Sequence, residues 1–436
     1  MTRVLIATTP APGHVVSLFE IAGELTRRGH EVRWYTGEAF REQVERTGAR
    51  FEPMAEGFDF GGKSREEAFP EHAGLTGLKS FKVGVRDIFY RTAKGQMADL
   101  LALLERFPAE RIVADDMCYG ACFASERTGI PLVWLANSIY IPGSRDTGPL
   151  GLGLPPSTTP FNRLRNAVLR FVADRWSMRD LRAEADRVRA EVGLPRLRKR
   201  AMENISRSPD LYLVGSVASF EFPRRDLLAG THFIGGLFGV PPDRFDPPAW
   251  WDELTGDRPV VLITQGTTAN DVGRMLAPAV RALADEDVLV VLTTGGALDV
   301  ERLLPLPGNV RMERFVPYHH LLPHVDVMMT NGGYNGVNAA LAHGVPLVVV
   351  PATEENPDVA ARVAFAGVGV VVKPAAVTEA ALRAAVSAVR TDESYRRRAA
   401  ELAVDLASGD APKRAVDLIE SAAVPQDQIP TGGVAR

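Results

Sequence analysis

Cysteines, long apolar runs and net charge are all scarce in this 436-residue chain, and each scarcity excludes a class of protein. The two cysteines, Cys118 and Cys122, lie four residues apart without further metal ligands nearby, so we expect buried thiols in a reducing cytoplasm. No apolar run approaches the ~20 residues that span a bilayer, and the first is too short for a signal peptide. We therefore expect a cytoplasmic protein without a membrane span.

The formal net charge is only -4, and the charged residues of both signs are scattered along the chain. Nothing in this distribution predicts a nucleic-acid partner or an anionic membrane surface as a binding partner. At 436 residues the chain is too long for one typical core and suits two domains. We place the first domain at residues 1–235, a linker rich in glycine and proline at 236–257, and the second domain at 258–411.

A dinucleotide-binding glycine motif is also missing. Residues 3–8 and 31–36 are predicted strands and residues 15–28 a helix, but the first turn holds Gly13 alone where G-x-G-x-x-G would be needed. This disfavours a nicotinamide-dependent dehydrogenase. His14 follows in the same turn, at the carboxyl end of the first predicted strand.

His14 has a predicted partner at the same edge of the sheet. Residues 112–114 form another predicted strand, which ends in Asp115 and Asp116. A carboxylate that accepts from the Nδ1–H of a histidine fixes its tautomer, so that Nε2 can act as a general base. The residues alone leave other interpretations open, because His14 could be a surface residue and either aspartate could cap the next helix.

Residues 326–350 predict a second strand, turn, helix and strand unit. Its turn is Asn331-Gly332-Gly333, and the helix at 334–343 is closed by Gly344. Glycines let the backbone come close to a ligand, and the amide groups at the start of a helix attract a phosphate. A Gly-Gly pair also marks ordinary loops, so this turn alone does not establish phosphate binding.

The order of features in residues 315–357, FVPYHHLLPHVDVMMTNGGYNGVNAALAHGVPLVVVPATEENP, resembles the nucleotide-sugar signature of family 1 glycosyltransferases. The bacterial branch that glycosylates macrolides and other natural products is the most similar. The resemblance implies an α/β fold of GT-B architecture, with two Rossmann-like domains facing across a cleft. It also implies inverting transfer of a hexose from a UDP- or dTDP-sugar to a hydroxyl group of an apolar small-molecule acceptor, without a cofactor or metal.

The resemblance assigns roles residue by residue. His14 becomes the general base, and counting back from Gly129-Ile130-Pro131 selects Asp115 as its partner, with Asp116 as the fallback. Residues 63–93, which are irregular, and residues 140–160 are predicted long loops, and residues 163–192 are a predicted long helix. The expected acceptor contacts lie in these loops and are Phe81, Phe89, Tyr140 and Ile141. The expected donor contacts are Thr267, Pro317, Tyr318, Asn331, Gly332, Gly333, Tyr334, Asn335, Gly336, Glu355 and Asn356.

This sequence departs from the family pattern at several of these positions. Relatives most often have histidine where Asn331 stands, and many have a glutamate for the ribose hydroxyls where Ala339 stands. The alanine predicts weaker recognition of the 2'-hydroxyl and easier acceptance of a dTDP-sugar. Glu355 and Asn356 replace an Asp-Gln pair. These departures motivate an alternative, a non-catalytic auxiliary protein that binds an aglycone or a partner transferase.

Two patterns could indicate a metal, but neither is expected to bind one. Asp285-Glu286-Asp287 is a literal Asp-x-Asp, yet it follows a predicted helix, away from the carboxyl edge of the sheet. The histidines at 319, 320 and 324 have no supporting ligands. In the family's architecture, residues 412–424 would cross back to the first domain as a helix, and we expect residues 425–436 to be disordered.

Overall fold

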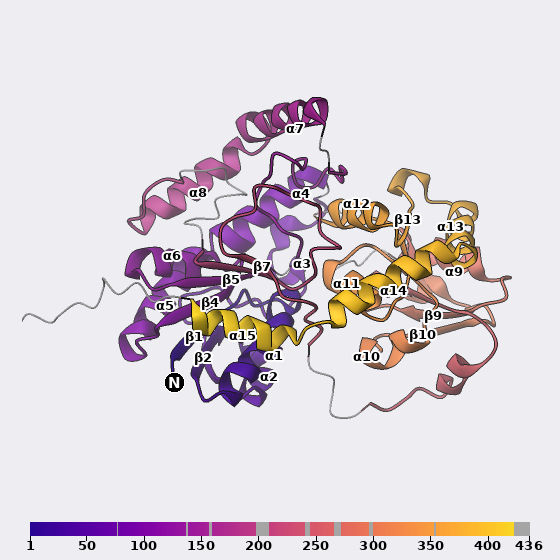
Figure 1. The fold of residues 1–436 in the computed structure, drawn as a ribbon, viewed down its shortest axis with the longest axis horizontal. Helices are drawn as coiled ribbons and strands as arrows, with labels where there is room; N and C mark the ends of the chain where they lie inside the picture. Colours follow the sequence, from indigo (N-terminus) through magenta and orange to yellow (C-terminus); the bar gives the residue numbers. More distant parts are fainter. Residues whose placement is uncertain are drawn as a thin grey trace, which may run out of the picture.

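The computed structural model of the chain describes residues 1–75, 77–136, 138–156, 159–197, 209–239, 245–265, 272–295, 300–352 and 355–422. These residues form two parallel β-sheets, one from each half of the chain (Figure 1). The arrangement confirms the predicted α/β fold class with two Rossmann-like sheets. None of the helices in the described ranges is both long and apolar enough to cross a membrane.

The first sheet has the strand order β3-β2-β1-β4-β5-β6-β7. Its strands are β1 (Arg3–Ala7), β2 (Glu31–Thr36), β3 (Arg50–Pro53), β4 (Arg111–Asp115), β5 (Leu132–Ala136), β6 (Leu211–Val214) and β7 (Thr231–Phe233). The central strands β1, β4 and β5 are buried along almost their whole length and mainly apolar, because both faces of the sheet are covered. The chain order reverses between β1 and β4, and ligands of open α/β sheets bind at such a switch point.

The second sheet has the order β10-β9-β8-β11-β12-β13 and reverses between β8 and β11. Its strands are β8 (Val260–Thr264), β9 (Leu289–Thr293), β10 (Val310–Glu313), β11 (Val327–Thr330), β12 (Leu347–Val349) and β13 (Gly369–Val371). Thr330 pairs with Thr264 in register, so the carboxyl ends of β8 and β11 lie side by side. The predicted phosphate turn starts directly after Thr330.

Helices connect the strands of both sheets. Those of the first half are α1 (Pro12–Arg27), α2 (Arg41–Arg46), α3 (Arg65–Ala68), α4 (Gly77–Gly84), α5 (Ala93–Arg106), α6 (Tyr119–Thr128), α7 (Pro160–Val172) and α8 (Arg179–Glu191). Those of the second are α9 (Leu276–Leu283), α10 (Tyr318–Leu321), α11 (Tyr334–Ala342), α12 (Asn356–Ala366), α13 (Glu379–Thr391), α14 (Glu393–Ala407) and α15 (Ala411–Ser421). Short turns include the π-helical η3 (Val85–Tyr90) and η4 (Ala173–Ser177).

Two predicted segments differ from the structure. Residues 63–93, predicted as an irregular loop, contain α3, α4 and η3, and α3 begins with a capping box between Ser64 and Glu67. That Ser-x-x-Glu spacing is a helix signal that the sequence analysis overlooked. Residues 163–192, predicted as one long helix, are divided by η4 into α7 and α8. The π-helical turn has no sequence signal that the helical period alone would reveal.

Segments of the first half pack into the core of the second. Ile139 and Phe220 belong to the same buried cluster as Leu262, Val337 and Val349. Ser216 donates a hydrogen bond to the Asn338 side chain at 2.6 Å. The two halves are therefore joined by apolar packing and not only by the chain that connects them.

The last helix returns from the second half to the first. Figure 1 shows α15 lying beside α1, although the two helices come from opposite ends of the sequence. Val416 and Ile419 share a buried cluster with Leu18 of α1, and Arg28 bonds Glu420 at 2.7 Å. Because α1 carries His14 in its first turn, α15 supports the helix that bears the predicted base.

Candidate active site

His14 and Asp115 are in contact. The Nδ1 atom of His14 lies 2.9 Å from Oδ1 of Asp115. Pro12 opens α1 immediately after the β1 turn, which places His14 in the first turn of the helix, and Asp115 ends the neighbouring strand β4. A carboxylate can only accept, so Nδ1 carries a proton, and in the neutral imidazole Nε2 then keeps its lone pair. The structure thus pairs the histidine with Asp115 and not with Asp116.

Asp115 is held rigidly. Its side chain is fully buried, and Oδ2 accepts from the Thr9 amide at 2.6 Å, while Oδ1 accepts from the Met117 amide at 3.0 Å. Asp116 points elsewhere and accepts from the Tyr212 hydroxyl at 2.7 Å. The main-chain donors fix the carboxylate so that it faces the imidazole.

The charges around His14 favour its protonated form. Burial alone would lower the pKa of His14, but the negative charges of Asp115, Asp116 and Glu355 outweigh it, and the pKa lies above its ordinary value. Stabilising the imidazolium is what a base needs after it has taken a proton. It also means that the neutral, basic form accumulates only above this raised pKa.

Glu355 links His14 to the second half of the chain. It precedes α12, and its charge acts on His14 of α1, which lies more than 340 residues earlier in the sequence. Asn356 begins α12 beside it. The residues predicted to contact the sugar therefore lie within electrostatic reach of the predicted base.

The predicted acceptor residues lie at two adjoining places. The ring of Phe89 is 5.7 Å from the His14 imidazole and 6.1 Å from the Tyr119 ring. Phe81, Tyr140 and Ile141 line a cavity between the two halves, whose other wall comes from α12. Phe89 is not part of that lining and lies on the histidine side instead.

Tyr140 forms a fixed part of the cavity wall. It is buried, and its hydroxyl accepts from the Leu228 amide at 2.8 Å. The guanidinium of Arg224 lies 4.8 Å above its ring. The mainly apolar lining fits an apolar guest better than a charged one.

The glycine turn after β11 has the expected backbone geometry. Gly332 has a φ of 89°, and a Cβ atom there would lie 3.0 Å from Val349 Cγ1. Gly333 caps α11 without a side-chain hydrogen bond, so the first amides of α11 have no side-chain cap. Asn331 donates from Nδ2 to the Gln265 carbonyl at 2.7 Å and joins this turn to the end of β8. Its second N–H is a further donor.

The other predicted donor residues are dispersed around this turn. Asn335 is exposed and Gly336 partly so, whereas Tyr334 is buried with its ring 6.4 Å from that of Phe220. The Tyr334 side chain therefore packs between the two halves. Tyr318 follows Pro317, and burial raises the pKa of its hydroxyl, which bonds the Thr264 side chain. Thr267 lies outside the described residues.

The sequence analysis missed a group of buried charges beside this site. Arg362 on α12 is 1% exposed and donates to both Glu221 oxygens, at 2.6 and 3.0 Å. Asp358, one turn earlier, accepts from the Gly151 amide at 2.5 Å. Both residues lie on the same helix face as Val359 and Val363, so their four-residue spacing within an apolar stripe was the available signal.

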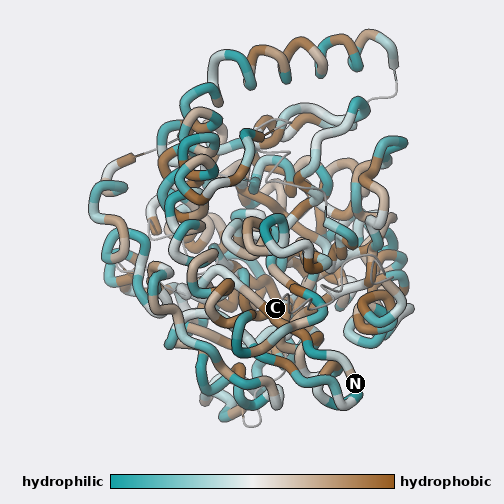
Figure 2. Tube along the Cα trace, turned by 90° about the vertical axis from the view of Figure 1, so that its left-hand side faces the viewer, coloured by the Kyte–Doolittle hydropathy of each residue, from teal (hydrophilic) through white to brown (hydrophobic). Residues whose placement is uncertain are grey.

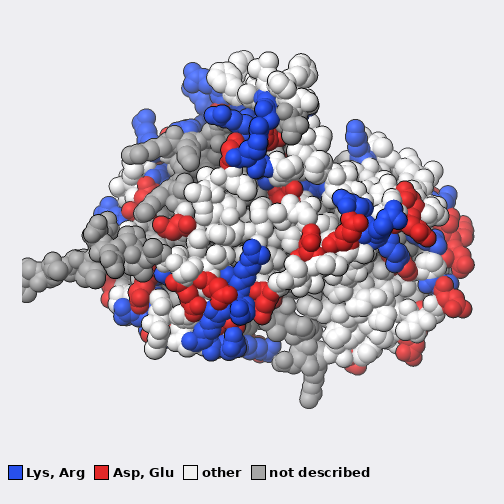
Figure 3. Space-filling model, in the orientation of Figure 1, with Lys and Arg blue, Asp and Glu red and all other residues white. Residues whose placement is uncertain are grey.

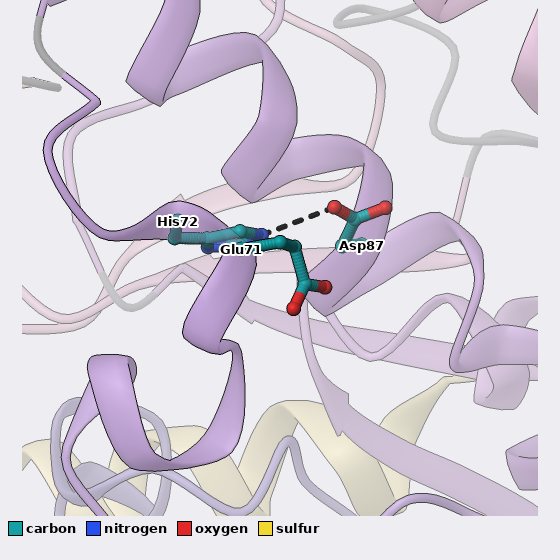
Figure 4. Close-up of side chains that lie close together, drawn as sticks. All are labelled: Glu71, His72 and Asp87. Carbon is teal, nitrogen blue, oxygen red and sulfur yellow. Dashed lines mark hydrogen bonds and ion pairs between the residues drawn. The ribbon is translucent and has the colours of Figure 1, made fainter.

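Glu71, His72 and Asp87 are the one set of three potential metal ligands that converges in the described ranges (Figure 4). Nε2 of His72 lies 3.0 Å from Asp87, and Nδ1 accepts from Arg65 at 3.1 Å. Arg86 and Arg91 also bind Asp87. These arginines occupy the lone pairs and supply the positive charge that a cation would bring, so the cluster is an ion-pair network.

The Asp-x-Asp sequence lies far from this chemistry. Asp285 and Asp287 are exposed between the end of α9 and the start of β9, at the amino edge of the sheet. Glu286 pairs with Arg383 at 3.1 Å. Of the histidines at 319, 320 and 324, His320 stacks on Phe245 with the ring centroids 4.5 Å apart.

Comparison with known proteins finds relatives along the whole chain. Residues 276–421 match the family model described as Erythromycin biosynthesis protein CIII-like, C-terminal domain. The chain is 60% identical to the 4'-demethylrebeccamycin synthase of Lentzea aerocolonigenes, with 96% of this chain and 99% of the relative covered. It is 30% identical to UDP-glycosyltransferase 2 of Phaeomoniella chlamydospora, with 97% of this chain and 96% of the relative covered.

Solved structures share the fold. The glycotransferase of kitacinnamycin superposes with a TM-score of 0.75 at 24% identity, covering 97% of this chain and 98% of that one. The glycosyltransferase VinC, in complex with dTDP, superposes with a TM-score of 0.67 at 21% identity, covering 96% and 99%. At these identities the likeness concerns the architecture alone.

Proposed function

Because the chain belongs to the family 1 glycosyltransferases of GT-B fold, in the branch that serves natural-product biosynthesis, we propose that it transfers a hexose from a UDP- or dTDP-sugar to a hydroxyl group of an apolar small molecule. The observation that carries this proposal is the contact of His14 with Asp115, with Glu355 of the second half in electrostatic reach. The residue proposed as general base and the segment proposed to bind the sugar would then face the same crevice.

The proposed reaction is a single displacement. His14 Nε2 takes the proton of the acceptor hydroxyl while that oxygen forms a bond to the anomeric carbon. The bond from this carbon to the diphosphate oxygen breaks on the opposite face, and the electron pair leaves with the nucleoside diphosphate. An α-linked donor therefore gives a β-glycoside. Asp115 stabilises the imidazolium that results.

The leaving diphosphate would meet the amino end of α11. Backbone amides and the dipole of a helix favour a developing negative charge, and they need little reorganisation. Gly332 and Gly333 place no side chain of their own beside these amides. We propose that Thr267, three residues after the end of β8 in the sequence, adds a hydroxyl donor.

We propose that this protein prefers a uridine donor less strictly than relatives that carry a glutamate at the position of Ala339. Ala339 is 6% exposed, and its methyl group can accept no hydrogen bond. A dTDP-sugar lacks the 2'-hydroxyl that such a glutamate would bind. The structural relative VinC was solved with dTDP, which agrees with this expectation.

The function is tested by incubating the protein with a panel of apolar phenols and alcohols and several UDP- and dTDP-hexoses, followed by mass spectrometry. We expect a product heavier than the acceptor by one hexosyl group, at a rate at least about 100-fold lower in a folded His14→Ala variant. Transfer only from UDP-sugars would remove the donor proposal. Neither transfer nor donor hydrolysis with any pair would favour a non-catalytic auxiliary role instead.

A further inference from the structure

The segment of α7 and η4 exposes its apolar face to solvent. Its large apolar side chains face solvent, with exposed fractions of 76% for Phe161, 65% for Phe171 and 81% for Trp176. Leu164, Val168 and Val172 are about half exposed or more. The helix projects from the top of the molecule in Figure 1, and Figure 2 shows apolar positions recurring along it. We call these six side chains the α7 stripe.

The polar side of the same helix faces the protein and is bonded there. Asn166 is fully buried, Arg163 pairs with Asp146 at 3.2 Å, and Arg170 donates to the Thr147 carbonyl at 3.0 Å. Turning the stripe inward would break these contacts and leave Asp146 without the ion pair that Arg163 makes with it. The outward orientation of the stripe is therefore fixed by the packing of the opposite face.

The spacing of the stripe fits another helix. Phe161, Leu164, Val168 and Phe171 follow one another by three, four and three residues, which is the spacing of a coiled-coil seam. These four side chains form a seam that suits a helix packing alongside, and Val172 and Trp176 lie to one side of it. The partner surface should therefore be an apolar helix of similar length.

The α7 stripe can provide that partner itself. Its exposed parts amount to about 700 Å², judged from the ~150–250 Å² of an aromatic side chain, and a standard interface needs ~800 Å² from each partner. The exposed arginines Arg175 and Arg179 both lie at the carboxyl end of the segment. Figure 3 shows basic groups beside an uncharged surface at the top of the molecule. An antiparallel pair would keep the arginines of the two copies apart.

We propose that α7 and η4 pair with the same segment of a second copy of this chain, antiparallel across a two-fold axis. Val168 lies midway between Phe161 and Trp176 and therefore close to that axis. Arg170 and Met178 line the cavity between the two halves, so the pairing would also steady one wall of the acceptor cavity. Symmetric dimers of this kind are the commonest oligomers.

Sedimentation equilibrium over a concentration series tests the proposal. The unaltered protein is expected to be a dimer, and V168D is expected to raise its dissociation constant about 100-fold or more, because two carboxylates would face each other at the axis. V404D is the matched control, since Val404 is an equally helical valine that is 68% exposed on α14. V168K alone should be monomeric, and an equal mixture of V168D and V168K should restore the dimer.

Several outcomes would overturn the proposal. A protein that stays monomeric throughout, a dimer that V168D leaves intact, or a dimer that V404D also dissociates would each exclude this interface. A monomer that floats with anionic phospholipid vesicles, and loses that binding in V168D, would assign the stripe to a membrane surface instead. All of these readouts are independent of sugar transfer, so they remain decisive if the proposed function fails.

Discussion

Replacing Asp115 with asparagine tests the proposed base directly. The carboxylate receives the Thr9 amide on one oxygen and the Met117 amide and His14 Nδ1 on the other. The side-chain amide of an asparagine has only one accepting atom and can take two orientations at this position. In one orientation its NH₂ group faces the Thr9 N–H. The other places the NH₂ against Met117 and His14, which would force the imidazole to carry its proton on Nε2.

Either arrangement costs activity. A buried donor left without an acceptor costs about 1–3 kcal/mol, and a histidine in the wrong tautomer cannot take the acceptor proton. We expect kcat/KM of Asp115→Asn to fall by about 100-fold to 10,000-fold. Circular dichroism and thermal unfolding serve as controls for folding.

The pH profile separates this role from a structural one. The negative charge of Asp115 helps to hold the pKa of His14 above its ordinary value, and the histidine acts as a base only above that pKa. Removing the charge lowers the pKa, so the acidic limb of the residual kcat/KM profile should move to lower pH. A limb that stays in place or moves to higher pH would refute the proposed role of the pair.

Three further predictions concern stability and metal dependence. Arg362→Ala leaves Glu221 buried without its bidentate partner and should lower the unfolding free energy in urea by about 3 kcal/mol or more, whereas exposed Arg398→Ala should change it little. Gly153→Ala should lower the unfolding free energy more than Gly77→Ala does. Both glycines have a φ of 57°, but only an alanine at 153 would bring Cβ to 2.7 Å from a backbone oxygen of α12. Equal urea midpoints of the two variants would contradict this. Transfer is expected to survive EDTA, and loss restored by Mg²⁺ would disprove the proposed independence of metal.

The sequence predicted the local parts of the site better than the contacts between distant parts. Apolar runs followed by His14, Asp115 or the Asn331 turn predicted which residues would stand at the carboxyl edges of the sheets. Parallel pairing then brings neighbouring strand ends together, as β1 and β4 do for His14 and Asp115.

Contacts across the two halves could not be predicted in this way. The burial of Tyr334 against Phe220 and the pairing of Arg362 with Glu221 depend on how the halves dock, and no periodicity within one helix specifies that. Similarly, the outward face of α7 depends on bonds such as that between Arg163 and Asp146. A hydrophobic stripe in the sequence gives a helix its two faces but does not say which one the rest of the protein covers.

The position of α15 has a consequence for synthesis of the chain on the ribosome. Val416 and Ile419 complete the apolar cover of α1, which was made some 390 residues earlier. Until those late residues emerge, the side of α1 that they cover stays open. The nascent first half should therefore depend on chaperones or transient contacts, and His14 on α1 should reach its final setting only after α15 has been made.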